Sequence, residues 1–197
     1  MTLERKDITA VILAGGQGRR MGGMDKGLLE FNGKPLVAIL IAELENQSVD
    51  IILNANRNLQ SYQAYGYPVI SDQLEDYQGP LAGFASAMKT VTTDYILTLP
   101  CDSPLLARDY VTRFLDCHAQ HAAPIIVAFD GVRLQPVHAL IRVDLLPSLI
   151  RFLESGDRKI DRWYARHDFR QADFSDMADM FRNINTPSDQ QSLEAEL

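Results

Sequence analysis

Residues 9–26 read TAVILAGGQGRRMGGMDK, and this stretch decides the fold. It opens with a continuous apolar run from Thr9 to Leu13 and then changes abruptly to glycine at positions 15 and 16. A short apolar run without alternation is typical of a strand buried on both faces, as in the parallel sheets of α/β proteins. The stretch therefore predicts a central strand that leads into a glycine-rich loop.

The loop after this strand has the composition of a phosphate-binding loop. Five of the 14 residues from 13 to 26 are glycine, and they are accompanied by the cations Arg19, Arg20 and Lys26. Glycines let backbone N–H groups wrap an anion and the cations neutralise it, so a triphosphate is the expected ligand. The P-loop and dinucleotide-binding spacings do not fit, because Lys26 precedes a glycine and position 21 is methionine. A flexible loop at a strand edge is the alternative.

The rest of the chain alternates short strand patterns with longer helical patterns. Strands are expected at 9–13, 51–53, 68–70, 95–99, 124–129 and 137–142. Helices are expected at 35–45, 81–90, 108–121 and 145–153 and from 187 onward. This alternation predicts βαβ units. We therefore expect an α/β fold: a single Rossmann-like three-layer domain over residues 1–197, with a mostly parallel central sheet and helices on both faces.

The composition points away from nucleic-acid and membrane partners. The 197-residue chain carries 26 acidic and 19 basic residues, a formal net charge of −7, so no global positive field would attract a nucleic acid. No apolar stretch approaches the roughly 20 residues of a membrane span, and residues 1–7 lack the apolar core of a signal peptide. With only two cysteines, Cys101 and Cys117, we expect a reducing, cytoplasmic environment.

Polar residues come just after three of the other predicted strands, within three positions of the strand end. Asn54 follows the strand at 51–53, Asp72 the strand at 68–70, and Asp102 the strand at 95–99. The carboxyl ends of parallel strands share one edge of the sheet, so these side chains should meet the glycine-rich loop there. Asp102 beside a triphosphate would hold Mg²⁺, and Asn54 and Asp72 could read a base edge or bind a ribose. Turn-forming or helix-capping roles are the alternatives.

Two more segments precede predicted helices. Residues 76–83, which include Gly79, would supply backbone donors close to a helix N-terminus. Asn183 and Asn185 lie just before the last helix, where a capping or turn role competes with ligand binding.

Several of these segments resemble a known family when they are taken in order. The block LAGGQGRRMG at 13–22, with Lys26 and GKPL at 33–36, resembles the signature of nucleotidyltransferases, which transfer NMP from an NTP. Five blocks narrow the resemblance to the molybdenum cofactor guanylyltransferase (MobA) family and span almost the whole chain. They are MDKGLL at 24–29, NANR at 54–57, GPLAG at 79–83, PCD at 100–102 and NINTP at 183–187.

The resemblance implies an activity and a mechanism. A member of this family transfers GMP from GTP to the terminal phosphate of Mo-molybdopterin, releases pyrophosphate and uses Mg²⁺. The pterin phosphate would attack the α-phosphorus, and it needs no general base because it is already an anion. GTP and molybdopterin would be the substrates, and the family makes a protein that delivers the pterin plausible. We expect a monomer.

The resemblance also implies roles for particular residues. Lys26 and Arg20 would stabilise the leaving pyrophosphate, and Asp102 would hold the Mg²⁺ that bridges the phosphates. Asn183 and Asn185 would lie at the acceptor end of the site. The implied GTP-binding residues are Leu13, Ala14, Gly15, Gly16, Gly18, Lys26, Asn54, Asp72, Gly79 and Asp102.

Two other functions stay open from the residues alone. One is a related cytidylyl- or guanylyltransferase that acts on another phosphorylated acceptor. The other is a non-catalytic module that binds GTP. Selectivity among nucleoside triphosphates would distinguish a cytidylyltransferase from the guanylyltransferase that the resemblance implies, because a pocket that pairs with one base strongly rejects another.

The remaining candidates are less specific. His118 and His121 lie three residues apart on a predicted helix, where we expect an exposed face rather than a metal site. Trp163 and Tyr164 are expected to pack the edge of the domain. Two readings stay open for the basic segment 156–159, whose cations could meet the pterin phosphate or cover a helix end.

Overall fold

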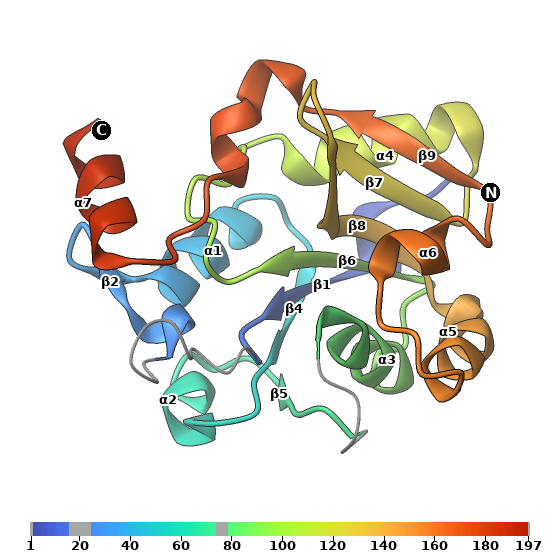
Figure 1. Cartoon of the computed structure of the whole chain (residues 1–197), viewed down its shortest axis with the longest axis horizontal. Coiled ribbons are helices and arrows are strands. Elements are labelled where there is room, and N and C mark those ends of the chain that lie inside the picture. The colour runs from blue at the N-terminus through green and yellow to red at the C-terminus, as the bar shows by residue number, and fades with distance from the viewer. Residues whose placement is uncertain (1, 16–24, 74–78, 197) are drawn as a thin grey trace.

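The structure of the chain is a computed structural model that describes residues 2–15, 25–73 and 79–196 (Figure 1). Seven strands form the main sheet in the order β5-β4-β1-β6-β8-β7-β9, and β2 and β3 form a separate hairpin. The strands are β1 (Ile8–Leu13), β2 (Glu30–Phe31), β3 (Lys34–Pro35), β4 (Asp50–Asn54), β5 (Val69–Ile70), β6 (Tyr95–Pro100), β7 (Ile125–Phe129), β8 (Leu134–Arg142) and β9 (Phe169–Asp173). The helices are α1 (Leu36–Glu45), α2 (Leu59–Gln63), α3 (Pro80–Thr90), α4 (Tyr110–His121), α5 (Leu146–Glu154), α6 (Ile160–Tyr164) and α7 (Pro187–Ala195).

The main sheet is mostly parallel, as expected. The central strand β1 pairs in parallel with β4 on one side and with β6 on the other. Strand β8 is the exception, because it runs antiparallel to both β6 and β7. The carboxyl ends of β1, β4 and β6 therefore lie side by side at one edge of the sheet.

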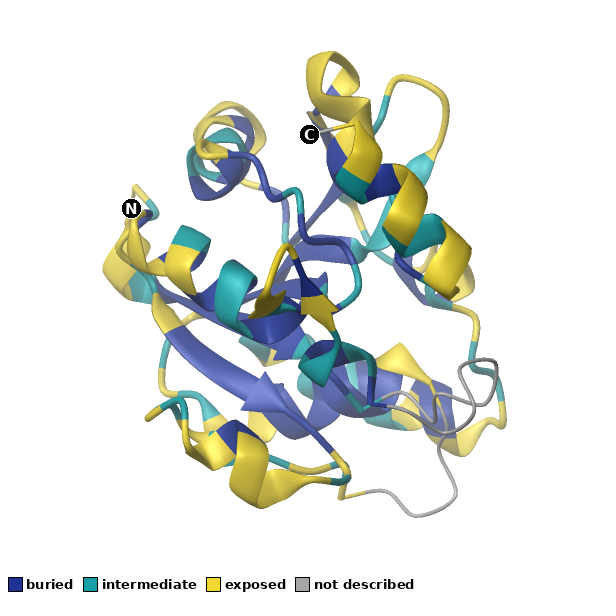
Figure 2. Ribbon diagram, turned by 90° about the vertical axis from the view of Figure 1, so that its left-hand side faces the viewer, coloured by how far each residue is buried: buried dark blue, intermediate teal, exposed yellow. Residues whose placement is uncertain are grey.

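Helices cover both faces of the sheet and make it the middle of three layers. One core cluster joins alternate residues of β1 (Ile8, Ala10 and Ile12) to side chains of α1, α2 and α4. A second cluster joins Val11 of β1 to side chains of α3, α5 and α6. Successive side chains of a strand point to opposite faces, which explains this division. Figure 2 shows the buried sheet between helices whose outer surfaces are exposed.

The structure differs from the sequence expectations at several elements. Strand β8 begins at Leu134 rather than 137, α1 begins after Pro35 rather than with it, and β9, α2, α6 and the β2–β3 hairpin were not predicted. The prediction that His118 lies on an exposed helix face is wrong, because its side chain is buried and its Nε2 lies 3.0 Å from the Tyr95 hydroxyl. Trp163 and Tyr164 are both fully buried in the second core cluster.

The chain after β9 continues along the carboxyl edge of the sheet as an arm, residues 174–196 (Figure 1). Its helix α7 packs on the β2–β3 hairpin, where Leu193 and Ile184 share a small core with Phe31 and Leu36. The Gln190 amide also donates to the Glu30 carbonyl at 2.8 Å. The arm thereby holds residues 183–185 against the strand ends. None of the helices within the described ranges is long and apolar enough to cross a membrane.

Candidate active site

The site is built at the edge where β1, β4 and β6 end. The amide of Ala14 donates to the Asn54 carbonyl at 2.8 Å, and the amide of Cys101 donates to the Leu13 carbonyl at 3.1 Å. These bonds continue the sheet one residue past its strands and fix the start of the glycine-rich loop between its two neighbours. Gly15 comes so close to the next strand that a Cβ there would lie 2.8 Å from Asn56 Nδ2. Leu13, Ala14 and Gly15 therefore stand where the sequence placed them, in the centre of the site.

One side of the site is a group of amides around a carboxylate. Asn54 Nδ2 donates to Asp72 Oδ1 at 3.0 Å, and Asn56 Nδ2 donates to Asp72 Oδ2 at 2.7 Å. The Asp72 amide donates back to Asn56 Oδ1 at 2.8 Å. Each Asp72 oxygen thus accepts one amide proton and retains a second lone pair for a ligand. Asn54 and Asp72 are brought together as expected.

The other side of the site is a lysine–carboxylate pair. Lys26 begins a 3₁₀ turn, Lys26–Leu28, and its Nζ lies 2.9 Å from Asp102 Oδ2 and 2.5 Å from Asn185 Oδ1. The side chains of Lys26 and Asp102 are only 23% and 14% exposed. A cation and a carboxylate are thus held together at the strand ends and largely screened from solvent, an arrangement that suits phosphate and metal binding.

Asp102 fits a divalent cation. Its second oxygen, Oδ1, is buried and has no hydrogen-bond partner among the described residues. A buried carboxylate oxygen without a partner is costly, so a ligand that satisfies it would be favoured. Mg²⁺ prefers such hard oxygens and needs only one or two carboxylates beside phosphates and water. In the described part of the chain, no group of three or more His, Cys, Asp or Glu side chains could hold a metal ion.

The C-terminal arm joins the same pair. The Ile184 amide donates to the Asp102 carbonyl at 2.8 Å, and the Ser103 hydroxyl donates to Asn183 Oδ1 at 2.7 Å. The cap of α7 is Thr186, which forms a capping box with Asp189. A capping role for Asn183 or Asn185 is therefore wrong. A capping role for Asp102 is also wrong, because Asp109 is the N-cap residue of α4.

The remaining predicted residues divide into two sets. Gly79 is the N-cap residue of α3 and has φ +121°, which side chains rarely adopt. The helix begins at Pro80, one residue before the predicted start at 81. Gly16, Gly18 and Arg20 lie outside the described residues.

Sequence reasoning missed three residues that the structure adds to this edge. Asn56 binds Asp72 and also donates to the Gly15 carbonyl at 3.3 Å. Asp25, directly before Lys26, is buried against the Tyr62 hydroxyl at 2.6 Å. Asn56 belongs to the NANR block and Asp25 to the MDKGLL block. Their positions in these motifs were a signal of function, but no role was assigned to either residue. Tyr62 had no signal, because its contact is tertiary.

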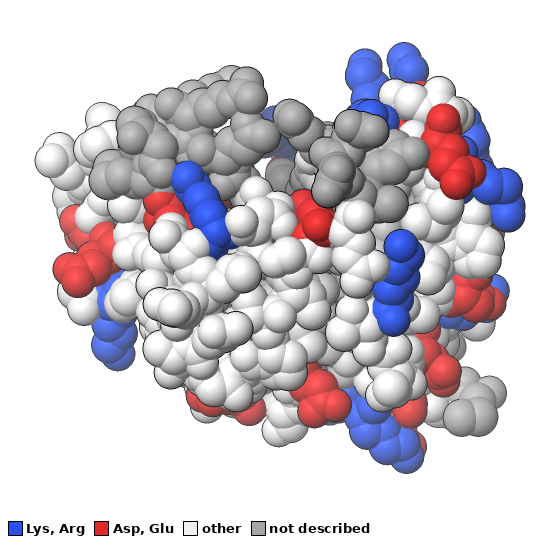
Figure 3. Space-filling view, turned by 90° about the horizontal axis from the view of Figure 1, so that it is seen from below, with Lys and Arg blue, Asp and Glu red and all other residues white. Residues whose placement is uncertain are grey.

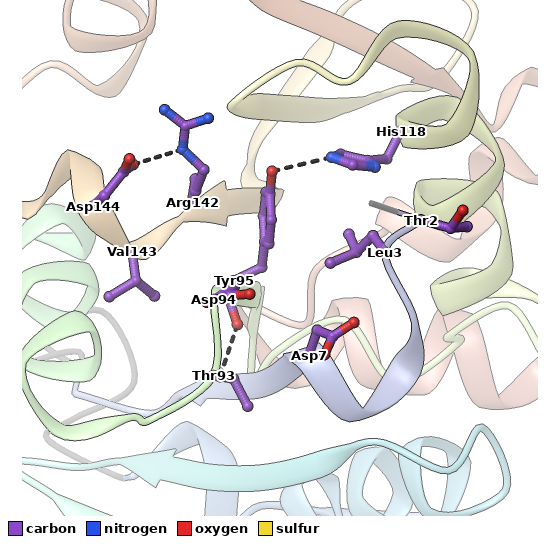
Figure 4. Close-up of a pocket in the computed structure, with 10 residues that line it drawn as sticks. All are labelled: Thr2, Leu3, Asp7, Thr93, Asp94, Tyr95, His118, Arg142, Val143 and Asp144. Atoms are coloured by element: carbon purple, nitrogen blue, oxygen red, sulfur yellow. Dashed lines mark hydrogen bonds and ion pairs between the residues drawn. The ribbon is translucent and has the colours of Figure 1, made fainter.

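A pocket of about 510 Å³ lies at the opposite end of the strands (Figure 4). It is lined by residues at the start of β1 and β6 and contains no predicted site residue. There the Tyr95 hydroxyl faces His118, and burial lowers the pKa of that imidazole. The face seen in Figure 3 carries acidic and basic side chains that are interspersed rather than gathered by sign among the described residues.

Comparison with known proteins decides the family. The family model described as the MobA-like NTP transferase domain matches residues 10–171. The chain belongs to the MobA-like NTP transferase family. The matched region of this MobA-like NTP transferase contains Lys26, Asn54, Asp72 and Asp102, and it ends before the C-terminal arm.

Relatives of this MobA-like NTP transferase extend the match to the arm. The molybdenum cofactor guanylyltransferase of Shewanella sp. strain MR-4 is 48% identical over 190 residues, which cover 96% of each chain. That of Shewanella piezotolerans is 48% identical over 186 residues, 94% of this chain and 91% of its own. The crystal structure of molybdopterin-guanine dinucleotide biosynthesis protein A from Archaeoglobus fulgidus has a TM-score of 0.78 and covers 96% of this chain and 97% of its own. At 21% identity it shares the fold.

Proposed function

We propose that the chain transfers GMP from GTP to the terminal phosphate of Mo-molybdopterin, releasing pyrophosphate and forming the guanine dinucleotide form of the cofactor. The observation that carries this proposal is the Lys26–Asp102 pair, with its buried and unpaired Asp102 Oδ1, at the strand ends. The acceptor follows from relatives that are molybdenum cofactor guanylyltransferases and are 48% identical over nearly the whole chain.

The base would bind at Asp72. Guanine presents two adjacent donors, N1–H and the N2 amino group, whereas adenine presents an acceptor at N1. The free lone pairs of Asp72 Oδ1 and Oδ2 suit two adjacent donors, because Asn54 and Asn56 already hold the carboxylate from the sides. A site that leaves buried polar groups unpaired with the wrong base discriminates strongly against it.

The triphosphate would lie between the start of the glycine-rich loop and Lys26. Asp102 would hold Mg²⁺ through Oδ1, and the bound ion would supply charge neutralisation at the reacting phosphates. The Lys26 ammonium would then exchange its present partners for oxygens of the leaving pyrophosphate, with Arg20 as a second cation. A phosphate acceptor is already anionic, so these residues would position and neutralise charge without acting as a general base.

The acceptor would approach from the C-terminal arm. Asn185 touches Lys26 and Asn183 touches Ser103, so both amides stand close to the Lys26–Asp102 pair. Base, phosphates and acceptor would then lie along one edge of the sheet, with the acceptor phosphate positioned for in-line attack on the α-phosphorus.

A thermal-shift panel with Mg²⁺ and each of GTP, ATP, CTP and UTP tests the nucleotide assignment. A ligand at about 100 times its Kd stabilises a protein by about 2.7 kcal/mol. We expect GTP to raise the melting temperature more than the other three nucleotides. A larger shift with CTP would contradict guanylyl transfer, and equal shifts with all four would contradict the role of Asp72.

We further propose that the chain acts in the cytoplasm as a single-domain monomer. Both cysteines are free and buried, as is usual for proteins of reducing compartments. The described strands and helices form one three-layer unit around one main sheet. Light scattering should give a mass near 22.1 kDa, and a mass of twice that value would contradict the monomer.

A further inference from the structure

Asp25 is a buried carboxylate that, within the described residues, is held by the segment after β4. Its side chain is 4% exposed. Oδ1 accepts from the Tyr62 hydroxyl at 2.6 Å, and Oδ2 accepts from Asn58 Nδ2 at 3.0 Å. Arg57 Nε lies 3.7 Å from Oδ2 and adds a positive charge. Charge-assisted hydrogen bonds of this kind are the strong ones, so residue 25, directly before Lys26, is anchored here.

Tyr62 touches the chain on both sides of Lys26. Before the lysine, its hydroxyl donates to Asp25. After the lysine, its ring packs so closely on Gly27 that a Cβ at Gly27 would clash with the hydroxyl and lie 3.3 Å from two ring atoms. Tyr62 is fully buried, and burial raises the pKa of its phenol far above the usual range. It therefore stays protonated and remains a donor.

The position of the Lys26 backbone decides where its ammonium can reach. The side chain is long and flexible, and holding it in one place costs conformational entropy. In the structure Nζ meets Asp102 and Asn185, which come from β6 and from the C-terminal arm. Two other parts of the chain thus converge on this ammonium, and a small displacement of residues 25–27 would move it away from them.

We propose that Tyr62 is a positioning residue for Lys26, which fixes the backbone of residues 25–27 through the Asp25 carboxylate and the Gly27 backbone. The inference rests on the proposed role of Lys26 in GMP transfer. Tyr62 would touch neither substrate. It would act on turnover through Lys26 alone, and it would leave base recognition at Asp72 unchanged.

The test compares Tyr62→Phe with Tyr95→Phe. Both tyrosines are buried, and each loses one hydroxyl contact, but Tyr95 faces His118 at the far end of the strands. We expect Tyr62→Phe to lower kcat about tenfold to a hundredfold, as misplacement by about 1 Å does. The KM for GTP should change less than about threefold, and Tyr95→Phe should keep wild-type kcat. Circular dichroism establishes that both variants are folded at the assay temperature.

A double-mutant cycle with Lys26→Ala separates positioning from a general loss of structure. If Tyr62 acts through Lys26, Tyr62→Phe should change kcat less than about twofold in the Lys26→Ala background. If the double variant instead loses kcat by the product of the two single losses, the inference is overturned. A wild-type kcat for Tyr62→Phe would also overturn it. Wild-type turnover of Lys26→Ala would instead overturn the proposed role of Lys26 itself.

A second variant keeps the test independent of Tyr62 packing. Asn58 is exposed and has φ +50°, so Asn58→Gly removes a donor to Asp25 at a position where glycine is favoured. We expect Asn58→Gly to lower kcat less than Tyr62→Phe does. In the Lys26→Ala background, Asn58→Gly should again change kcat less than about twofold. An unchanged kcat in both Asn58→Gly and Tyr62→Phe would show that the Asp25 anchor has no part in turnover.

Discussion

The side chain of Asn56 is exposed, yet it forms two hydrogen bonds with Asp72, the proposed base-binding residue, and a third with the Gly15 carbonyl. Asn56→Ala removes the donor to Asp72 Oδ2 and frees the carboxylate to rotate. We expect the Kd for GTP to rise about tenfold, which corresponds to about 1.4 kcal/mol, with little change in melting temperature. Titration of GTP in a thermal-shift assay measures this.

Asn46→Ala is the matched control for Asn56→Ala. Asn46 is also exposed, but it lies at the end of α1, which leads to the start of β4 and hence to the opposite edge of the sheet. This variant should bind GTP as the wild type does. Equal affinity of the Asn56 and Asn46 variants would show that Asp72 does not need its second amide partner.

Single residues could be predicted where chemistry and position coincide. Asn54, Asp72 and Asp102 each follow an apolar run, so strand ends alone brought them to one edge. The Asp25–Tyr62 bond could not be predicted, because it joins residues 37 positions apart whose only relation is tertiary. The helix-capping alternatives for Asp102 and Asn185 were removed by the observed caps, Asp109 and Thr186.

At the scale of elements, helix α3 packs against the ends of β1 and β4 on the proposed base-binding side of the site. Gly83 in this helix has so little room that a Cβ would lie 2.7 Å from Asn54 Oδ1 and 2.7 Å from Leu13 Cδ2. Alanine is the better helix former by about 1 kcal/mol, but overpacking costs about 1–3 kcal/mol. We therefore expect Gly83→Ala to lower both the melting temperature and the affinity for GTP.

Ala82→Gly provides the comparison for Gly83→Ala. Ala82 is buried in the same helix, and its replacement costs about 1 kcal/mol of helix propensity without adding an atom. This variant should melt earlier but bind GTP normally. If Gly83→Ala also binds GTP normally, Asn54 is not part of the nucleotide site.

The elements that were missed have different causes. The β2–β3 hairpin could have been predicted from the pair Asn32-Gly33, because Asn-Gly is the typical two-residue hairpin turn. Both residues have the positive φ that this turn requires. Strand β9, FRQAD, is an edge strand whose polar residues hide its period, and α2 and α6 have only five residues each. The antiparallel direction of β8 follows from the short connection after β7, which excludes a crossover helix.

At the scale of the whole molecule, the stability of the fold should depend on pH through His138. This histidine is fully buried with the Tyr110 hydroxyl 3.2 Å from Nδ1, and burial lowers its pKa to about 3. In the unfolded chain this imidazole takes up a proton near pH 6.5, whereas in the folded chain it stays neutral down to about pH 3. The free energy of unfolding is therefore undiminished by this group above pH 6.5 and falls as the pH drops from 6.5 toward 3. The expected slope from this group is about 1.4 kcal/mol per pH unit.

Urea denaturation between pH 7 and pH 4 measures this dependence. His138→Phe keeps a ring in the same core and removes the titrating group, and Tyr110 retains its bond to the Thr98 carbonyl. The variant should lose stability less steeply than the wild type. His121→Asn, on the exposed end of α4, should keep the wild-type slope. Parallel curves for His138→Phe and the wild type would contradict the assignment.

The overall architecture could be predicted because alternating strand and helix patterns leave few arrangements. The route of the C-terminal arm could not, since it depends on the small core of Phe31, Leu36, Ile184 and Leu193. That core brings Asn185 to Lys26, so the assembled site exists only in the complete fold.

The most direct test of the account is transfer of label from GTP. The chain is incubated with Mg²⁺, molybdopterin and GTP that is labelled at the α-phosphate, and the pterin product is isolated. We predict that the label appears in the pterin product in step with pyrophosphate release, and that Asp102→Asn lowers both at least about a hundredfold while the fold is kept. Full transfer by Asp102→Asn, or pyrophosphate release without labelled pterin, would contradict the account.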